Sequence, residues 1–410
     1  MSRSLDANLD STKGYHHRRR HLRQTIRVTL LVIAVLLLIP WAKETRLLVV
    51  VPALSPLIAL ASLLSMRTFH IATGIGLLVA VIVLIRHRWF CRWVCPTGTC
   101  ADVTARLGLR LRRRCPRLPP IGQWIALLTL GGAVLGYPLL LWLDPLALFS
   151  GLLGIRYVQS IPGTGWSAIG VVAVLALSVA WPGIWCARLC PLGAFQDLLS
   201  RLSRMVSRAV SRTRRMMHKE TDGGLPRRAV LGVVTGISLA AVMQRVRASA
   251  SPPLRPPGAV DEARFAGLCV RCGNCLRACP TQIIRPDRGE HGIAGLFTPT
   301  LDFSRDYCHK DCIRCTQVCP SGALVPLTAK QKQRTSIGLP RVDMDICLLG
   351  DDRECSICRN WCPFEAITLE FSPIEYTLAP KIDPEKCPGC GACQAVCPTS
   401  PVKAIVIHPI

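Results

Sequence analysis

The stretch CVRCGNCLRACP at residues 269–280 and the stretch CPGCGACQAVCP at residues 387–398 decide the fold of the C-terminal part of this chain. Both have the spacing Cys-x2-Cys-x2-Cys-x3-Cys-Pro. Thiolate sulfur is a preferred ligand of iron–sulfur clusters, and this spacing is typical of a segment that wraps around a [4Fe–4S] cluster. The two stretches therefore predict a fold that is organised by bound clusters.

Two more runs of four cysteines lie between these stretches, each with one enlarged gap. Three residues separate Cys308 from Cys312, and seven separate Cys347 from Cys355. The fourth cysteine of every run is followed by proline. All sixteen cysteines of residues 251–410 belong to the runs, which are Cys269, Cys272, Cys275 and Cys279; Cys308, Cys312, Cys315 and Cys319; Cys347, Cys355, Cys358 and Cys362; and Cys387, Cys390, Cys393 and Cys397.

The fourth cysteine of each run is expected to bind a different cluster from the other three, because this is the rule in two-cluster ferredoxins. The first two runs would then form one unit at 251–330 and the last two another at 331–410. The expected ligands of four [4Fe–4S] clusters are Cys269, Cys272, Cys275 and Cys319; Cys308, Cys312, Cys315 and Cys279; Cys347, Cys355, Cys358 and Cys397; and Cys387, Cys390, Cys393 and Cys362. Zinc is the alternative metal, but it is typical of Cys-x2-Cys pairs separated by a longer stretch.

Around these runs the pattern indicates a small α+β fold. Short helices are expected at 276–278 and 394–396, and strands at 366–370 and 404–407. Aliphatic residues are too few for such units to be stable alone, so loss of the clusters should unfold them.

The N-terminal part has the composition of a membrane domain. The chain is 50% hydrophobic and 18% charged, with a mean hydropathy of +0.34. Apolar stretches close to the length that crosses a bilayer, about 17 to 25 residues, occur at 28–41, 47–64, 69–85, 121–143 and 169–185. We expect a multi-domain protein with an α-helical membrane domain of four to five spans over 26–200, in which prolines break the second stretch.

The positive charge of the chain predicts how the spans are oriented. The net charge is +25, yet residues 251–410 hold 18 Lys and Arg against 17 Asp and Glu, so nearly all of the excess lies before them. It is concentrated in a tail at 1–25, between residues 86 and 117, and in a linker at 201–226. Positive segments beside spans stay in the cytoplasm, so we expect these three there and 144–164 outside. Anionic lipid, rather than nucleic acid, is the expected partner of this charge.

The segments FCRWVCPTG at 90–98 and WCARLCPLG at 185–193 form an internal repeat with two cysteines each. The charge pattern places both at the cytoplasmic ends of spans. Four thiolates together suit a fifth iron–sulfur cluster or zinc, and the alternative is four buried structural cysteines. The cysteines are Cys91, Cys95, Cys186 and Cys190, whereas Cys100 and Cys115 have no counterpart in the second segment and are expected to be non-ligands.

Residues 227–250 resemble a twin-arginine export signal placed inside the chain. Arg227 and Arg228 precede about 15 mostly apolar residues, and the triplet Ala248-Ser249-Ala250 resembles a peptidase site. Left uncut, the segment would be one more span and would place residues 251–410 in the periplasm. The alternative is an amphipathic helix on the cytoplasmic surface.

Both halves are similar to known proteins. The runs at 269–280 and 347–363, with CPSGAL at 319–324 and AITLE at 366–370, resemble NapG/MauM-type four-cluster ferredoxins. The two Cys-x3-Cys-Pro segments and the apolar stretches resemble NapH/MauN-type polyferredoxin membrane proteins. In the family, these two proteins form a quinol dehydrogenase that passes electrons to a periplasmic reductase, as in nitrate respiration, so the resemblance implies a fusion of the two. One departure is that 201–219 has no cysteine, where the membrane family has cytoplasmic cluster runs.

The resemblance implies a multi-pass protein of the bacterial inner membrane that relays electrons from menaquinol or ubiquinol to a periplasmic reductase or cytochrome. The ferredoxin half would have no substrate site of its own, and no catalytic residue is identified. Asp144 is a candidate acceptor for a quinol proton, with His70 and His87 as secondary candidates, although Asp144-Pro145 is also typical of a turn at a helix end. The alternative function is an accessory protein that reductively matures or reactivates a metalloenzyme.

Overall fold

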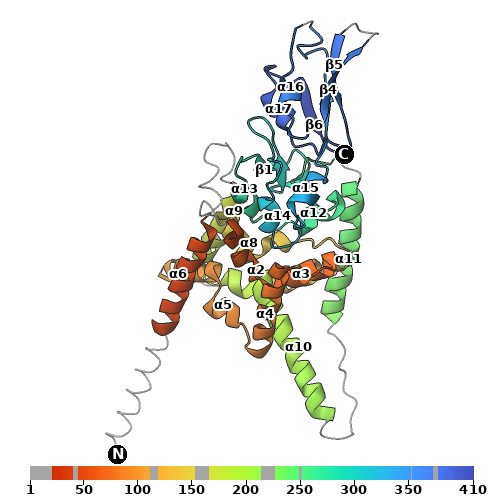
Figure 1. Ribbon diagram of the computed structural model, residues 1–410. Helices are drawn as coiled ribbons and strands as arrows, with labels where there is room; N and C mark the ends of the chain where they lie inside the picture. The colour runs from red at the N-terminus through yellow and green to blue at the C-terminus, as the bar shows by residue number, and fades with distance from the viewer. Residues whose placement is uncertain are drawn as a thin grey trace, which may run out of the picture.

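Residues 21–39, 45–110, 119–152, 166–213, 227–248, 252–351, 353–372 and 377–410 are described by the computed structural model. They form a helical part before residue 249 and a part built from loops, short helices and hairpins after it (Figure 1). Most of the predicted tail, much of the predicted linker and the last two residues of the signal-like segment lie outside the described residues.

The helical part follows the apolar stretches of the sequence. Its elements are a helix over His21–Leu38, η1 (Thr45–Val49), α2 (Val50–Ala53), α3 (Pro56–Met66), α4 (Ile71–Ile85), α5 (Trp89–Trp93), α6 (Pro96–Arg110), α7 (Ile121–Val134), η2 (Leu141–Leu143), α8 (Pro145–Leu152), α9 (Trp166–Ala180), η4 (Trp185–Leu189), α10 (Pro191–Thr213) and α11 (Arg227–Ala248).

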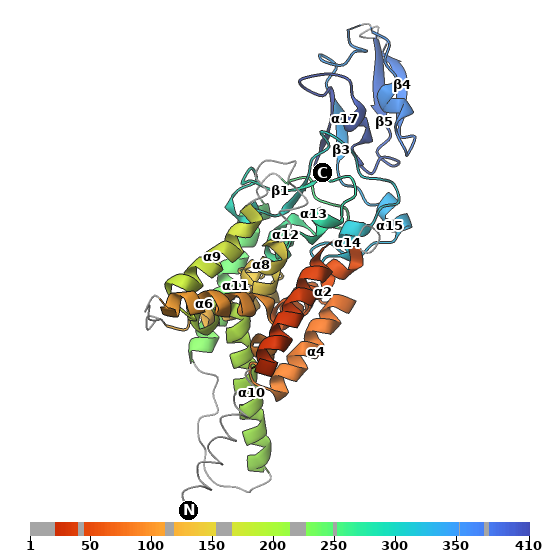
Figure 2. The ribbon, with the colours of Figure 1, turned by 90° about the vertical axis from the view of Figure 1, so that its left-hand side faces the viewer.

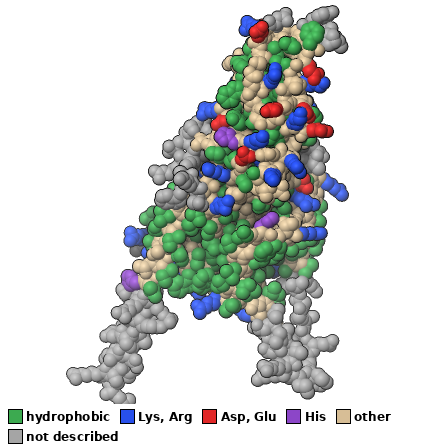
Figure 3. Space-filling model, in the orientation of Figure 1, with side chains coloured by type: hydrophobic (Ala, Val, Ile, Leu, Met, Phe, Trp, Pro, Cys, Tyr) green, Lys and Arg blue, Asp and Glu red, His purple; other side chains and the backbone are tan. Residues whose placement is uncertain are grey.

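Two described helices, His21–Leu38 and Arg228–Val246, are long and apolar enough to cross a membrane. A bent pair, Thr45–Ala53 and Pro56–Met66, would make a third span if it counts as one. The helices α4 and α7 and the apolar stretch of α9 are shorter, so four to five spans remain a prediction. Figure 3 shows hydrophobic side chains over a broad face of the helical part, whereas charged side chains are frequent on the C-terminal part.

Two apolar stretches are interrupted, one at Ser55 and the other after Val134. The predicted break in 47–64 is confirmed, because the helices before and after Ser55 meet at 98°. The prediction of one helix over 121–143 is wrong: α7 ends at Val134, and Gly136 takes a left-handed conformation with φ +85° that turns the chain. Beyond Asp144 the chain enters α8 instead of the expected loop.

Ser55 and Asp144 cap the helices α3 and α8. The Ser55 hydroxyl accepts the N–H of Ile58, and the Asp144 carboxylate accepts the N–H of Leu146 at 2.9 Å. The Ser55 hydroxyl also donates to Asp144 at 2.6 Å, and both side chains are fully buried. The helices α3 and α8 therefore begin at one point inside the helical part, and the helix-end interpretation of Asp144 is confirmed.

The signal-like helix α11 packs tightly along α7. A Cβ added to Gly131 of α7 would lie 2.3 Å from the carbonyl oxygen of Val233, and one added to Gly236 of α11 would lie 2.5 Å from that of Leu128. Small residues allow this close backbone approach, which is a common way for helices to associate in membranes. The two glycines thus fix α11 against α7.

Replacing Gly236 by Leu is expected to push α11 away from α7. The added side chain would overlap the backbone of Leu128, and such overpacking costs about 1–3 kcal/mol. The thermal unfolding midpoint of the purified full-length chain should therefore fall. Ser238→Leu is the matched control, because Ser238 is exposed on the same helix. Equal midpoints for the two variants would contradict the packing described here.

The C-terminal part has the expected short strands and helices, with the predicted strands in β4 and β6 and the predicted helices in α13 and α17. Its strands form three antiparallel pairs, β1–β2, β3–β6 and β4–β5. The elements are α12 (Glu262–Leu268), α13 (Asn274–Ala278), β1 (Ile284–Pro286), η5 (Ile293–Gly295), β2 (Pro299–Leu301), α14 (Arg314–Gln317), α15 (Ala329–Gln333), β3 (Leu339–Val342), α16 (Ile357–Asn360), β4 (Ile367–Ser372), β5 (Thr377–Ile382), α17 (Ala392–Val396) and β6 (Ile405–His408).

The two cysteine-rich units share one hydrophobic core. Phe303 of the first unit lies against Gly391 of the second, so closely that a Cβ on the glycine would be 2.3 Å from the ring. The N–H of Cys308 donates to the carbonyl oxygen of Cys390 at 2.9 Å. Figures 1 and 2 show α12, α13 and α14 next to the helical part and the β4–β5 hairpin farthest from it.

Candidate functional site

The structure brings the sixteen C-terminal cysteines together in four sets. Each set takes three thiols from one run and the fourth from another run, which is the crosswise grouping expected from the sequence. Iron binding by these sets stays a prediction. We name the sets by their order from the helical part: the proximal set (Cys269, Cys272, Cys275, Cys319), the second set (Cys308, Cys312, Cys315, Cys279), the third set (Cys387, Cys390, Cys393, Cys362) and the distal set (Cys347, Cys355, Cys358, Cys397).

Burial governs the acidity of these thiols. It raises the pKa of Cys272 to about 12, and repulsion from Cys319 adds to the effect. Burial likewise raises the pKa of Cys390 to about 11, with a further contribution from Cys362. Thiols must lose their protons to bind a metal. A buried set of four therefore fits a cationic iron–sulfur core, which would offset part of the negative charge of the thiolates that burial alone disfavours.

Cys397 of the distal set differs from the other buried thiols. Burial acts to raise its pKa, but hydrogen bonds from the hydroxyl and N–H of Thr399 and from the N–H groups of Ala404 and Ile405 outweigh it and lower the pKa. These donors would also stabilise a thiolate ligand. The distal set lines a small pocket whose other walls include Leu349 and Ile405.

The four sets follow one another along the C-terminal part. Neighbouring sets lie close enough for their thiols to interact electrostatically. The interacting pairs are Cys275 with Cys315, Cys308 with Cys390, and Cys358 with Cys393. The sets therefore form a single row that begins at the helical part and ends with the distal set.

The four cysteines of the two repeat segments line one open cavity of about 600 Å³. The two repeat segments hold their sulfur atoms in the same way, since the N–H of Gly98 donates to Cys95 Sγ and the N–H of Gly193 donates to Cys190 Sγ, both at 3.4 Å. In each segment the proline after this cysteine begins a helix, α6 or α10, whose first N–H groups need acceptors. We call these four residues the membrane set: Cys91, Cys95, Cys186 and Cys190.

Positive side chains surround the membrane set. Arg88 pairs with Asp197 through two hydrogen bonds, the Nε one at 2.6 Å, and Arg27 pairs with Asp102 at 2.6 Å. The cavity has two carboxylates in its lining but six guanidinium groups, so its net charge is positive and suits four thiolates around an iron–sulfur core. The arginines are Arg23, Arg27, Arg88, Arg92, Arg201 and Arg204.

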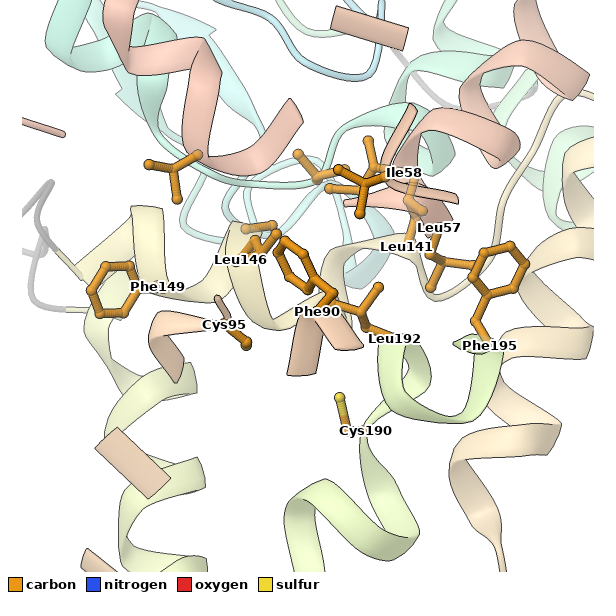
Figure 4. Close-up of a cluster of buried hydrophobic side chains, with 14 of the residues drawn as sticks. Leu57, Ile58, Phe90, Cys95, Leu141, Leu146, Phe149, Cys190, Leu192 and Phe195 are labelled. Atoms are coloured by element: carbon orange, nitrogen blue, oxygen red, sulfur yellow. The ribbon is translucent and has the colours of Figure 1, made fainter. Parts of the chain in front are cut away.

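The membrane set and the proximal set meet in one hydrophobic core. Cys95, Cys190 and Cys272 all belong to the same cluster of buried side chains. Figure 4 shows Cys95 and Cys190 at the lower edge of this core, below Phe90. The cysteines of the helical part are thus linked by continuous packing to the first set of the C-terminal part.

The remaining candidates have different surroundings. His87 lines the cavity of the membrane set, and its Nδ1 lies 2.9 Å from the Ser200 hydroxyl. His70 precedes α4 and contacts the Thr68 hydroxyl at 3.1 Å. Cys100 lies on α6, outside the residues that line the cavity. Cys115 lies outside the described residues.

Comparisons with known proteins agree with this arrangement. The family model of the 4Fe-4S dicluster domain matches residues 268–323 and 353–400, and that of the 4Fe-4S binding domain matches 68–115 and 164–209. The methylamine utilization ferredoxin-type protein MauM of Methylobacillus flagellatus is 35% identical over 190 residues, which is 45% of this chain and 79% of MauM. The ferredoxin-type protein NapG of Escherichia coli is 37% identical over 187 residues, or 43% of this chain and 76% of NapG.

The chain belongs to the family of ferredoxin-type proteins that includes MauM and NapG. The ferredoxin-type protein NapF of Escherichia coli is also similar, at 33% identity over 161 residues, 39% of this chain and 88% of NapF. No solved structure matches the chain. This ferredoxin-type chain is therefore an iron–sulfur protein of electron transfer. Within the described ranges, no three His, Cys, Asp or Glu side chains converge as the ligands of a single metal ion would.

The crosswise grouping predicts which cysteine variants share a phenotype. Cys319→Ser and Cys269→Ser should alter the same EPR signal, and Cys279→Ser should match Cys308→Ser, each with a loss of about one to four iron atoms, because each iron of a [4Fe–4S] cluster is held by one thiolate. Iron and sulfide analysis of the anaerobically purified protein, with EPR, measures both. Cys100→Ser is the control and should keep all iron. A shared signal for Cys319→Ser and Cys308→Ser would contradict the grouping.

Gln196 is a site residue that cysteine spacing could not reveal. It is fully buried on α10, and its side-chain amide donates to Cys91 Sγ at 3.1 Å. Hydrogen bonds to cluster sulfur help to set reduction potential, because they stabilise the more negative, reduced state. The only sequence signal is its position just after the second repeat segment.

Gln196→Leu is expected to lower the reduction potential of a cluster held by the membrane set while leaving its iron bound. An EPR-monitored redox titration measures this shift. Gln244→Leu is the matched control, because the Gln244 amide donates to the backbone carbonyl of Leu135 in the same helical part, not to sulfur. An unchanged potential in Gln196→Leu would show that this hydrogen bond has no influence on the centre.

Proposed function

We propose that this chain is a membrane-anchored iron–sulfur protein that relays electrons from membrane quinol to a periplasmic reductase or cytochrome. The observation that carries the proposal is the row of five cysteine sets. The membrane set shares a core with Cys272, and the second, third and distal sets continue from there to the far end of the molecule. In the proposal, electrons pass between neighbouring centres of this row without a diffusing carrier.

The broken helices explain how a row of this kind is possible. Cysteines at the cytoplasmic ends of spans and clusters outside would be separated by the hydrocarbon thickness, roughly 30 Å. Here α6 begins directly after Cys95, and the hydroxyl of Thr97 donates to the carbonyl oxygen of Pro145 at 2.7 Å. At the other end of α8, the hydroxyl of Ser150 donates to Asn274 of the C-terminal part at 2.9 Å. One short helix thus connects the two cysteine-bearing regions.

The residues around each set would tune the clusters. A bound [4Fe–4S] cluster supplies a one-electron carrier whose potential depends on hydrogen bonds to sulfur and on nearby charge. Gly98, Gly193 and Gln196 donate to sulfur in the membrane set. The arginines of the cavity add positive charge. Both effects favour acceptance of an electron, as a centre that receives electrons from quinol requires.

Of the three proton-acceptor candidates, His87 is best placed for quinol oxidation. Asp144 is sealed in the interior and caps α8, so its carboxylate is already occupied. His87 is half exposed, with 53% of its side chain accessible, and lies in the cavity beside the membrane set. A quinol oxidised there would give its two electrons, one at a time, to the membrane set, one proton to His87 and the other to water in the open cavity.

The proposed location is the bacterial inner membrane, with the helical part in the bilayer. The positive tail, the arginines of the cavity and the linker would face the cytoplasm. The helix α11 would act as an uncut anchor, since it packs against α7, and the C-terminal part would lie in the periplasm. Its distal set, farthest from the membrane, would deliver electrons to the reductase or cytochrome.

The decisive experiment counts iron and sulfide in anaerobically purified protein and records EPR spectra before and after addition of a menaquinol analogue. Five clusters require about 20 iron atoms per chain, and four require about 16. We expect about 20, with partial reduction by quinol and slower reduction in His87→Gln. His70→Gln is the matched control.

Other results would each remove a part of the proposal. About 16 iron atoms would exclude a cluster at the membrane set, and zinc in place of iron would exclude the relay. Full iron content without any response to quinol would favour the second function, reductive maturation of a metalloenzyme by the same clusters.

A further inference from the structure

The buried side chain of Arg277 joins the C-terminal part to the helical part. It lies on α13, within the first cysteine run, and is 5% exposed. Its guanidinium donates to the carbonyl oxygen of Leu38 at 3.0 Å and to the Ser150 hydroxyl at 2.7 Å. Leu38 ends the helix that begins at His21, and Ser150 lies in the last turn of α8. One side chain therefore holds the ends of two helices.

Asn274 on the same short helix completes the contact. Its amide nitrogen donates to the carbonyl oxygen of Leu48 at 2.8 Å and to that of Val318 at 3.2 Å. Its carbonyl oxygen accepts the Ser150 hydroxyl and the Arg277 guanidinium. A buried network of this kind specifies one arrangement of the surfaces that it joins, since any displacement leaves polar groups unsatisfied.

Arg277 occupies a position at which the other runs have no cation. It is the middle residue of the gap between the third and fourth cysteines, and its equivalents are Gln317, Asn360 and Ala395. Gln317 also reaches the helical part, because Arg46 donates to it at 3.3 Å, whereas Asn360 is exposed. The arginine is thus specific to the run that forms the proximal set beside the helical part.

The charge of Arg277 lies next to the proximal set. The guanidinium also donates to the carbonyl oxygen of Cys272, at 3.3 Å. The acceptors named here are neutral oxygens. The carbonyl groups at helix ends carry partial negative charge, which makes such a site favourable for a cation. In a buried setting this charge would stabilise an electron added to the neighbouring centre.

We propose that Arg277 is the positioning residue of the junction at which electrons pass from the membrane set to the proximal set. It holds the proximal set against the ends of two helices, and its charge favours the reduced state of the centre bound there. The direction of electron flow rests on the proposed function. The contact between the two parts of the chain and the reduction potential of the proximal centre do not depend on that direction.

The test is Arg277→Met in the full-length protein, loaded with iron and sulfide under anaerobic conditions. We expect all C-terminal iron to be kept and the ratio of reduced to oxidised proximal centre at a fixed potential to fall about tenfold, which is 59 mV for one electron. Cys272→Ser identifies the EPR signal of this centre. Hydrogen exchange should become faster in α8. Arg277→Lys should restore the potential better than the exchange protection, because lysine keeps the charge but not the planar fork.

Arg359→Met is the matched control, because Arg359 lies in the same gap of the third run and is exposed. If Arg277→Met loses iron, Ser150→Ala is the variant to test instead, because it removes one hydrogen-bond acceptor of Arg277 on the helical side. Faster exchange in α13 with iron kept would support the junction. Two results would overturn the junction proposal. One is unchanged hydrogen exchange in α13 of Ser150→Ala, and the other is a reduction potential of the proximal centre in Arg277→Met equal to that in Arg359→Met. Neither readout needs quinol, so failure of menaquinol to reduce the wild-type protein would refute the proposed function separately.

Discussion

Each cysteine run of the C-terminal part gives its fourth thiol to another run's set, and this exchange is the constraint on which the rest of the structure depends. Cys279 completes the set of the second run, and Cys319 completes that of the first. No run can form a set alone, so the runs must fold in pairs even though their strands are only three to six residues long. Contacts between the pairs, such as Phe303 against Gly391, then align all four sets in one row.

The helical part meets a different constraint, because backbone groups freed at a helix break must find partners inside an apolar bundle. Ser55 and Asp144 supply them and also bind one another. Burying these polar groups costs free energy, but it allows α8 to begin in the interior. Since α8 begins in the interior, its other end can carry Ser150 to the surface that receives α13, and the membrane set comes within one core of the proximal set.

Much of the site could be predicted from sequence because ligand spacing is a local property. The four runs and the paired segments around Cys91 and Cys186 are recognised from gaps of two to seven residues, and the crosswise sets follow from the rule for two-cluster ferredoxins. The junction could not be predicted in this way. Arg277, Asn274 and Gln196 take their roles from partners more than 100 residues away, and no local pattern marks them. The prediction of one helix over 121–143 was wrong for a related reason. Hydropathy shows that a stretch is apolar, but it does not show that the chain turns at Gly136.

A single chain changes what the junction must achieve. Separate proteins would have to pay the translational and rotational cost of association from the contact surface alone. Here α11 joins the two halves covalently, so docking is intramolecular and the effective concentration is high, in the millimolar range for short linkers. The surface does not have to maximise affinity, so the polar network around Arg277 can lie beside its apolar contacts and set the charge next to the proximal centre. In a chain of this kind, the strength of the contact and the potential of the centre can be adjusted by the same side chain.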